Sequence, residues 1–105
     1  MATYLLAYHG GGMPDTDQER ASVMAEWGQW FGALGESLVD GGNPVGQTRT
    51  IASGGSVSDG GGSNPVSGYT VIKADTLDRA VTMARGCPLL KSGGSIEVCE
   101  TVPAM

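Results

Sequence analysis

Residues 2–9 read ATYLLAYH, and the predicted fold is built around this segment. It combines aromatic and aliphatic side chains without a glycine or proline, which is typical of a β-strand. Successive side chains of a strand point to opposite faces of a sheet. One face would carry Thr3, Leu5, Ala7 and His9, and the other would carry Tyr4, Leu6 and Tyr8. Because both faces are largely apolar, we predict a central strand that is covered on both sides.

A helix is predicted after this strand, over residues 16–35. The run Thr16-Asp17-Gln18-Glu19 fits a capping box, in which the Thr and Glu side chains bond free backbone N–H groups at the helix start. Gly35 is suited to end the helix. Large apolar residues recur between these ends at spacings of three and four, and they form a broad stripe: Val23, Met24, Trp27, Trp30, Phe31 and Leu34.

The rest of the chain contains further strand signals and a second helix. Residues 38–40 are extended, and the segments 47–52 (QTRTIA) and 56–59 (SVSD) predict a hairpin around a Ser-Gly-Gly turn. Residues 69–74 (YTVIKA) predict a strand, and residues 76–86 predict a helix that Asp75 or Thr76 can cap and that ends at a glycine shortly before a proline. Residues 95–101 (SIEVCET) predict the last strand.

The order of these elements indicates an α+β fold. Strand, helix, hairpin, strand, helix and strand approximate the ferredoxin-like β-α-β-β-α-β sandwich with an additional hairpin strand. Two helices can cover only one face of such a sheet, although apolar residues occupy both faces. Leaving the second face in water would cost about 25 cal/mol per Å² of apolar surface. We therefore expect a second copy of the chain to cover it in a homodimer.

The composition argues against binding to nucleic acid or to a membrane. The chain has 105 residues, which suits one domain, and a formal net charge of −5 with only six Lys and Arg. Proteins that bind phosphate backbones gather basic residues on one face. No segment is apolar over a bilayer's width, and the start lacks the features of a signal peptide, so we expect a cytoplasmic protein. Cys87 and Cys99 lack CxxC spacing and are expected to be reduced.

Six segments, taken in order, carry a resemblance to a known family. They are MATYLLAYHG, MAEWGQWFGALG, LVDGG, VSDGGG, GYTVIKADTLDRAVTMARGCP and GGSIEVCETVP. Together they resemble the YCII-related, or DGPF-domain, proteins, and the resemblance makes residues 1–105 a single domain of that kind. It implies a ferredoxin-like subunit that pairs into a dimeric α+β barrel with the two sheets facing. Some relatives of this barrel act on small aromatic or lactone-like compounds, with a His and an Asp for proton transfer.

Two positions depart from the family pattern. Asp59 and Gly60 are followed by Gly61 and Gly62, where the family name has Pro and Phe. The enzyme-like members are expected to carry a histidine on the first helix, and the helix predicted here has none.

His9 and Asp40 are the candidate catalytic residues. His9, the only histidine, stands at the end of a central strand, where it could act as a general base near neutral pH. The alternative is a strand-end histidine whose ring bonds a backbone carbonyl or water. Asp40 matches the family position after the first helix, and it would orient His9 or take a proton itself. The alternative for Asp40 is a turn residue ahead of two glycines.

Tyr8, Trp30 and Arg49 are the candidate ligand-binding residues. Trp27 and Trp30 could line a pocket for a flat ligand, although their helical spacing also suits core packing. Trp30 lies toward the edge of the apolar stripe, which favours it over Trp27. Arg49 could meet an anionic ligand or remain a solvated surface charge. A lone histidine is a poor metal site and no nucleotide-binding glycine pattern occurs, so we expect no metal and no cofactor.

Two classes of function are compatible with these residues. The first is a homodimer with a small-molecule cleft, in which His9 and Asp40 transfer a proton in an isomerase- or lyase-like reaction. The second is a non-catalytic binding or regulatory module on the same barrel. A first helix without histidine favours the second class, whereas His9 and Asp40 favour the first. The sequence leaves open whether the chain is an enzyme.

Overall fold

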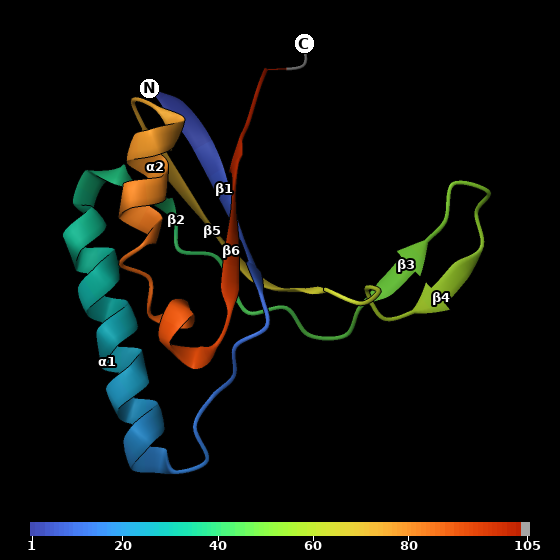
Figure 1. Cartoon of the computed structure of the whole chain (residues 1–105), viewed down its shortest axis with the longest axis horizontal. Coiled ribbons are helices and arrows are strands. Elements are labelled where there is room, and N and C mark those ends of the chain that lie inside the picture. Colours follow the sequence, from blue (N-terminus) through green and yellow to red (C-terminus); the bar gives the residue numbers. More distant parts are fainter. Residues whose placement is uncertain (104–105) are drawn as a thin grey trace.

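The computed structural model describes residues 1–103 and contains two helices, six strands and two short 3-10 turns within that range (Figure 1). In chain order these are β1 (Ala2–His9), α1 (Asp17–Leu34), η1 (Gly35–Ser37), β2 (Leu38–Asp40), β3 (Arg49–Ile51), β4 (Val57–Asp59), β5 (Val66–Ala74), α2 (Leu77–Ala84), η2 (Pro88–Ser92) and β6 (Ser95–Glu100).

The main sheet has the strand order β2-β5-β1-β6, and every neighbouring pair is antiparallel. β1 is therefore central, with β5 on one side and β6 on the other. When the hairpin is set aside, this order is that of the ferredoxin-like sandwich, with each helix crossing over between two strands that flank a third. The predicted α+β fold class is confirmed for the subunit.

The position of the hairpin differs from the prediction. The strand next to β5 is Leu38–Asp40, whereas β3 and β4 form a separate two-stranded sheet and contribute nothing to the main one. Leu38 packs against the core, while every residue of β3 and β4 is exposed. Because Leu38 packs against the core and the hairpin residues do not, β2 rather than the hairpin pairs with β5 at the edge of the main sheet.

Both helices begin at a threonine: Thr16, as predicted, and Thr76, one of the two candidates for the second helix. The Thr16 side chain accepts a hydrogen bond from the Glu19 N–H at 3.1 Å, and the Thr76 side chain accepts one from the Arg79 N–H at 3.1 Å. At the other end of α1, Gly35 takes a positive φ of 54° and its N–H bonds the Phe31 carbonyl. The capping signals therefore predicted both helix starts and the end of α1.

Both helices pack on one face of the sheet, and the core lies between the helices and this face (Figure 1). Its largest fully buried members are Tyr4, Leu6, Thr70 and Ile72, which alternate along β1 and β5. The residues between them point to the opposite side of the sheet, which neither helix covers. We call this side the open face, and its apolar members are Leu5, Ala7, Val39, Tyr69, Val71 and Cys99.

A long hairpin leaves the body of the subunit between β2 and β5 (Figure 1). Its stem, residues 43–45 and 67–69, continues the sheet pairing: Val45 N–H bonds the Ser67 carbonyl at 2.9 Å, and Pro44 bridges to Gly68. Beyond the stem, residues 46–65 form a projecting arm that carries β3 and β4.

Candidate functional site

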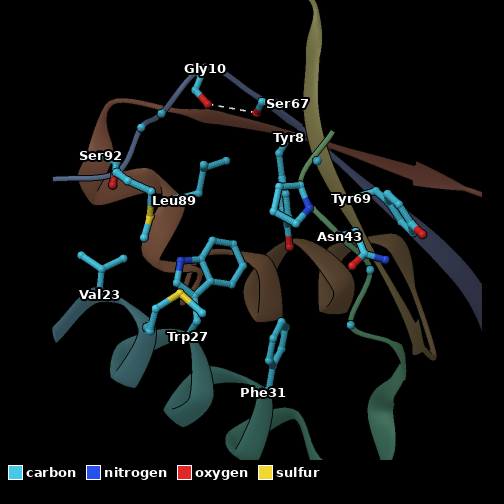
Figure 2. A pocket seen from close by; sticks show the side chains of 18 residues that line it. Tyr8, Gly10, Val23, Trp27, Phe31, Asn43, Ser67, Tyr69, Leu89 and Ser92 are labelled. Atoms are coloured by element: carbon cyan, nitrogen blue, oxygen red, sulfur yellow. Dashed lines mark hydrogen bonds between the residues drawn. The ribbon is translucent and has the colours of Figure 1, made fainter. Parts of the chain in front are cut away.

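A cavity of about 390 Å³ lies between α1 and the end of the sheet where β1 runs into its glycine turn (Figure 2). Three parts of the chain enclose it: one face of α1, the glycine-rich turns after β1 and β2 with the stem, and the η2 turn. The lining residues are Tyr8, Gly10–12, Met13, Val23, Met24, Trp27, Phe31, Gly41–Pro44, Ser67–Tyr69, Leu89 and Ser92. This size is within the usual range for small-molecule sites.

Aromatic rings form one wall of the cavity. Trp27 packs edge-on against Tyr8, with ring centroids 5.6 Å apart and planes at 68°, and it contacts Phe31 at 5.8 Å. Trp27 and Phe31 lie one helical turn apart on α1 and point toward the sheet, as Figure 2 shows. Leu89 faces them from η2. The cavity is therefore walled by flat, apolar surfaces that suit a ring.

The Tyr8 hydroxyl is held at the base of this wall. It donates a hydrogen bond to Thr70 Oγ1 at 2.5 Å, and Thr70 Oγ1 donates in turn to the Gly41 carbonyl at 3.0 Å. Burial raises the pKa of the Tyr8 hydroxyl well above its ordinary value, and the neighbouring Cys87 thiol contributes in the same direction. The phenol therefore stays protonated near neutral pH and offers no base to a ligand.

Glycines bring the backbone up to the cavity. Gly42 has φ of +72°, and a Cβ placed there would come within 1.7 Å of the Tyr69 carbonyl oxygen. A Cβ on Gly11 would come within 2.6 Å of Leu89 Cδ1. Only glycine permits these close approaches, and two of the glycine clusters of the sequence lie at the cavity for this reason.

The rim of the cavity is polar. Ser67 donates a hydrogen bond to the Gly10 carbonyl at 2.9 Å, which ties the stem to the turn after β1. The Asn43 side chain lies at the cavity beside Tyr69, whose ring is turned away (Figure 2). A shallow hollow adjoins the cavity, and there Lys91 Nζ lies 3.8 Å from Glu26 Oε2.

His9 lies on the open face and does not line the cavity. Its Nδ1 lies 3.0 Å from the Asn64 carbonyl and 3.1 Å from the Pro65 carbonyl, so this nitrogen is the donor to both. Its Nε2 lies 2.5 Å from Glu97 Oε1, but it forms no hydrogen bond with the described residues. This geometry corresponds to the strand-end histidine bonded to backbone carbonyls.

Asp40 also lies outside the cavity, and its side chain accepts a hydrogen bond from the Gly42 N–H at 2.8 Å. This bond is that of a turn residue ahead of glycine. The register sets Asp40 level with Val71 and Leu5, four residues along β1 from His9 and two strands away. Strand spacing makes that separation on the order of 15 Å. Within one subunit the structure does not bring His9 and Asp40 together.

The three expected ligand-binding residues lie in three different parts of the structure. Tyr8 lines the cavity. Trp30 instead lies in the core at 7% exposure, where its Nε1–H donates to the Met83 carbonyl at 3.0 Å, and its neighbour Trp27 faces the cavity. Arg49 lies on the arm, with its Nε 3.6 Å from Asp59 Oδ1. The expectation that favoured Trp30 over Trp27 is corrected, because α2 covers Trp30 and leaves Trp27 free.

Several lining residues were not anticipated, among them Phe31, Leu89 and Asn43. One signal was available: Val23, Trp27 and Phe31 follow one another at intervals of four, so they share a single edge of the helical stripe. Glycine turns precede and follow that helix in the sequence, and glycine has no side chain that could fill the space beside it.

Among residues 1–103, no cluster of three or more His, Cys, Asp or Glu side chains could hold a metal ion. Neither helix of the same range has the length and apolarity that a bilayer crossing requires.

No family model matches the chain, and no curated protein matches it. Among solved structures, the chain is similar to the 5-chloro-2-hydroxyhydroquinone dehydrochlorinase of Burkholderia phenoliruptrix AC1100 in its complex with 2,5-dihydroxybenzoquinone. The two chains share 17% sequence identity over 90% of each, with a TM-score of 0.48. At this identity a likeness concerns the course of the backbone and not the chemistry of a site.

Proposed function

We propose that this protein binds a small, flat and largely apolar molecule between α1 and the sheet. The observation that carries the proposal is the aromatic wall of the cavity, in which Trp27 contacts both Tyr8 and Phe31. Rings are recognised by such walls through stacked and edge-on contacts. The cavity of about 390 Å³ is suited to a molecule of one or two rings.

Binding without catalysis is favoured by the kinds of side chain that line the cavity. Among residues 1–103, the lining contains no His, Asp, Glu, Lys or Arg. The tyrosine whose ring faces the cavity, Tyr8, has a raised pKa because it is buried, so it stays protonated near neutral pH and offers no base. General acid–base chemistry needs a group that gains and loses a proton in reach of the substrate. The non-catalytic binding or regulatory module is therefore the proposed class.

The polar rim supports an oriented ligand. Asn43 and Ser92 offer hydrogen-bond donors and acceptors on opposite sides of a largely apolar space (Figure 2). A ligand with a hydroxyl or carbonyl group on its ring could place that group at the rim and its ring against Trp27.

We propose further that the active form is a cytoplasmic homodimer of the YCII-related kind, with the open faces of two sheets packed together. Support comes from the apolar residues of the open face, such as Leu5, Ala7 and Val71, and from the family resemblance of the sequence segments. Half-buried apolar side chains at the centre of a sheet are a natural core for a symmetric interface.

The test is a calorimetric titration with 2-naphthol, a flat two-ring compound with one hydroxyl, and with cyclohexanol as the non-planar comparison. We expect saturable binding of 2-naphthol that is weakened about 10-fold or more by Trp27→Leu, because truncating a central aromatic contact costs more than about 1 kcal/mol. Trp30→Phe is the matched control, since it also changes a tryptophan of α1 but not the cavity. Equal affinity in wild type and Trp27→Leu would place the ligand elsewhere and refute the proposal.

A further inference from the structure

The arm, residues 46–65, points away from its own subunit. In Figure 1 the helices lie on one side of the main sheet and the arm extends on the other side, beyond the open face. All residues of β3 and β4 are exposed. An isolated two-stranded hairpin is at best marginally stable in water, so an arm of this kind needs a surface to lie on.

One face of the arm is apolar. Ile51 and Val57 are directly opposed across the β3–β4 ladder, and they are 72% and 59% exposed. Arg49 and Asp59 form the next pair on the same face, because side chains alternate along a strand. The side chains of Thr50 and Ser58 point to the opposite face. The apolar pair is thus flanked by a charge pair and faces one direction only.

The arm and the open face form one continuous surface. The stem carries the β5 ladder directly into the arm, and the base of the arm is tied to the open face by His9, whose ring bonds the Asn64 and Pro65 carbonyls. Any body that covers the open face therefore lies beside the base of the arm, which extends on the same side of the sheet (Figure 1).

The distribution of charge on this surface indicates a second copy of the chain as that body. The arm carries Arg49 and Asp59, and the open face carries Lys73, Glu97 and, level with Val71, Asp40, so the two together carry a formal charge of −1 apart from His9. The other four net negative charges of the chain lie outside them. Two copies of an acidic chain repel each other least across a surface with little net charge. Polyanions such as nucleic acid or an acidic membrane find no excess of basic residues there.

We infer that the arm is a clasp that reaches across the interface and packs its Ile51–Val57 face on the second subunit. This inference rests on the proposed homodimer and adds a contact to it. In a two-fold symmetric pair each arm reaches the other subunit, so the contact is made twice. Because the stem residues Asn43, Pro44 and Ser67 also line the cavity, a seated arm holds one wall of the ligand site in place.

The test is sedimentation equilibrium on the full chain, with Ile51→Asp/Val57→Asp compared with Ser56→Asp/Ser58→Asp. Both variants add two negative charges to exposed positions of the arm, but on opposite faces of the hairpin. We expect the first pair to weaken dimerisation about 10-fold or more, since it buries two carboxylates in the clasp, and the second pair to leave it within about 2-fold.

Hydrogen exchange of the arm amides is the second measurement. We expect the ladder amides of β3 and β4 to be protected at concentrations where the protein is dimeric and to exchange freely on dilution to monomer. If the wild type is a dimer and both double variants dimerise as tightly as it does, the clasp is overturned and the dimer is kept. A wild-type chain that stays monomeric at all accessible concentrations would overturn both, whereas the 2-naphthol titration reports on the cavity separately.

Discussion

Nε2 of His9 lies 2.5 Å from Oε1 of Glu97, while Nδ1 of the same ring faces the carbonyl oxygens of Asn64 and Pro65. Both ring nitrogens therefore face acceptors. The side chain of His9 is almost fully buried and that of Glu97 is 64% exposed. His9 thus joins β1, β6 and the base of the arm.

Replacing His9 by Ala is expected to cost about 1–3 kcal/mol of unfolding free energy, because two backbone carbonyls lose their donor in a part-buried place. Glu97→Ala is expected to cost less than about 1 kcal/mol, since an exposed ion pair contributes little. Urea unfolding of the two variants measures both values. Ligand affinity should be unaffected by either change, because neither residue lines the cavity. Loss of 2-naphthol binding in His9→Ala, with folding intact, would contradict this assignment.

Gly42→Ala is expected to destabilise the protein by more than about 2 kcal/mol. Its φ of +72° strains any other residue, and the new Cβ would lie 1.7 Å from the Tyr69 carbonyl oxygen, which is backbone and must move. Gly46→Ala is the matched control, because nothing lies within 4 Å of the Cβ position there. Thermal unfolding of the two variants is the measurement. Equal midpoints would show that the turn after β2 is not held as described.

Tyr8→Phe is expected to lower stability by about 0.5–1.5 kcal/mol, because it removes the hydroxyl that donates to Thr70. Thr70 keeps its bond to the Gly41 carbonyl, and the ring that lines the cavity is unchanged. The affinity for 2-naphthol should therefore stay within about 2-fold of wild type, since only one neutral hydrogen bond outside the ligand is lost. A much larger loss of affinity would mean that the hydroxyl touches the ligand directly.

The two cysteines are expected to differ in their reaction with an aromatic disulfide reagent. Cys87 is buried and burial raises the pKa of its thiol, so it should stay unreacted in the folded protein. Cys99 lies half-buried on the open face and should react. If that face is the dimer interface, the rate at Cys99 falls as protein concentration rises. A Cys99→Ser variant that still reacts at the same rate would show that Cys87 is the accessible thiol.

Local signals in the sequence predicted most of the elements. The alternation of ATYLLAYH, the two N-terminal threonines of the helices and Gly35 each act over a few residues, and the structure has β1, α1 and α2 where they indicate. The hairpin over 47–59 also forms, because its pairing is local. Its place outside the main sheet was not predictable, since it depends on whether Leu38 or the hairpin is buried beside β5.

The candidate site was less accessible to sequence reasoning. Trp27 and Trp30 share one apolar stripe, and nothing in their spacing says which of them faces a void. The choice is made by α2, which covers Trp30 and accepts its indole hydrogen bond at Met83. Such a contact joins positions 53 residues apart, so no local pattern records it. The glycine clusters were recognised as turns, but their role as cavity wall appears only when the turns converge.

ATYLLAYH is recognisable from the sequence as a central strand with two apolar faces, and the two helices are recognisable from their own caps and apolar spacing. That information is local, because alternation and caps act within a few residues. The folded structure was needed to show which face the helices take, that the second face stays open beside a projecting arm, and that Trp27 rather than His9 meets the cavity. These outcomes depend on the packing of segments far apart in the chain, where the burial of one side chain settles the exposure of another.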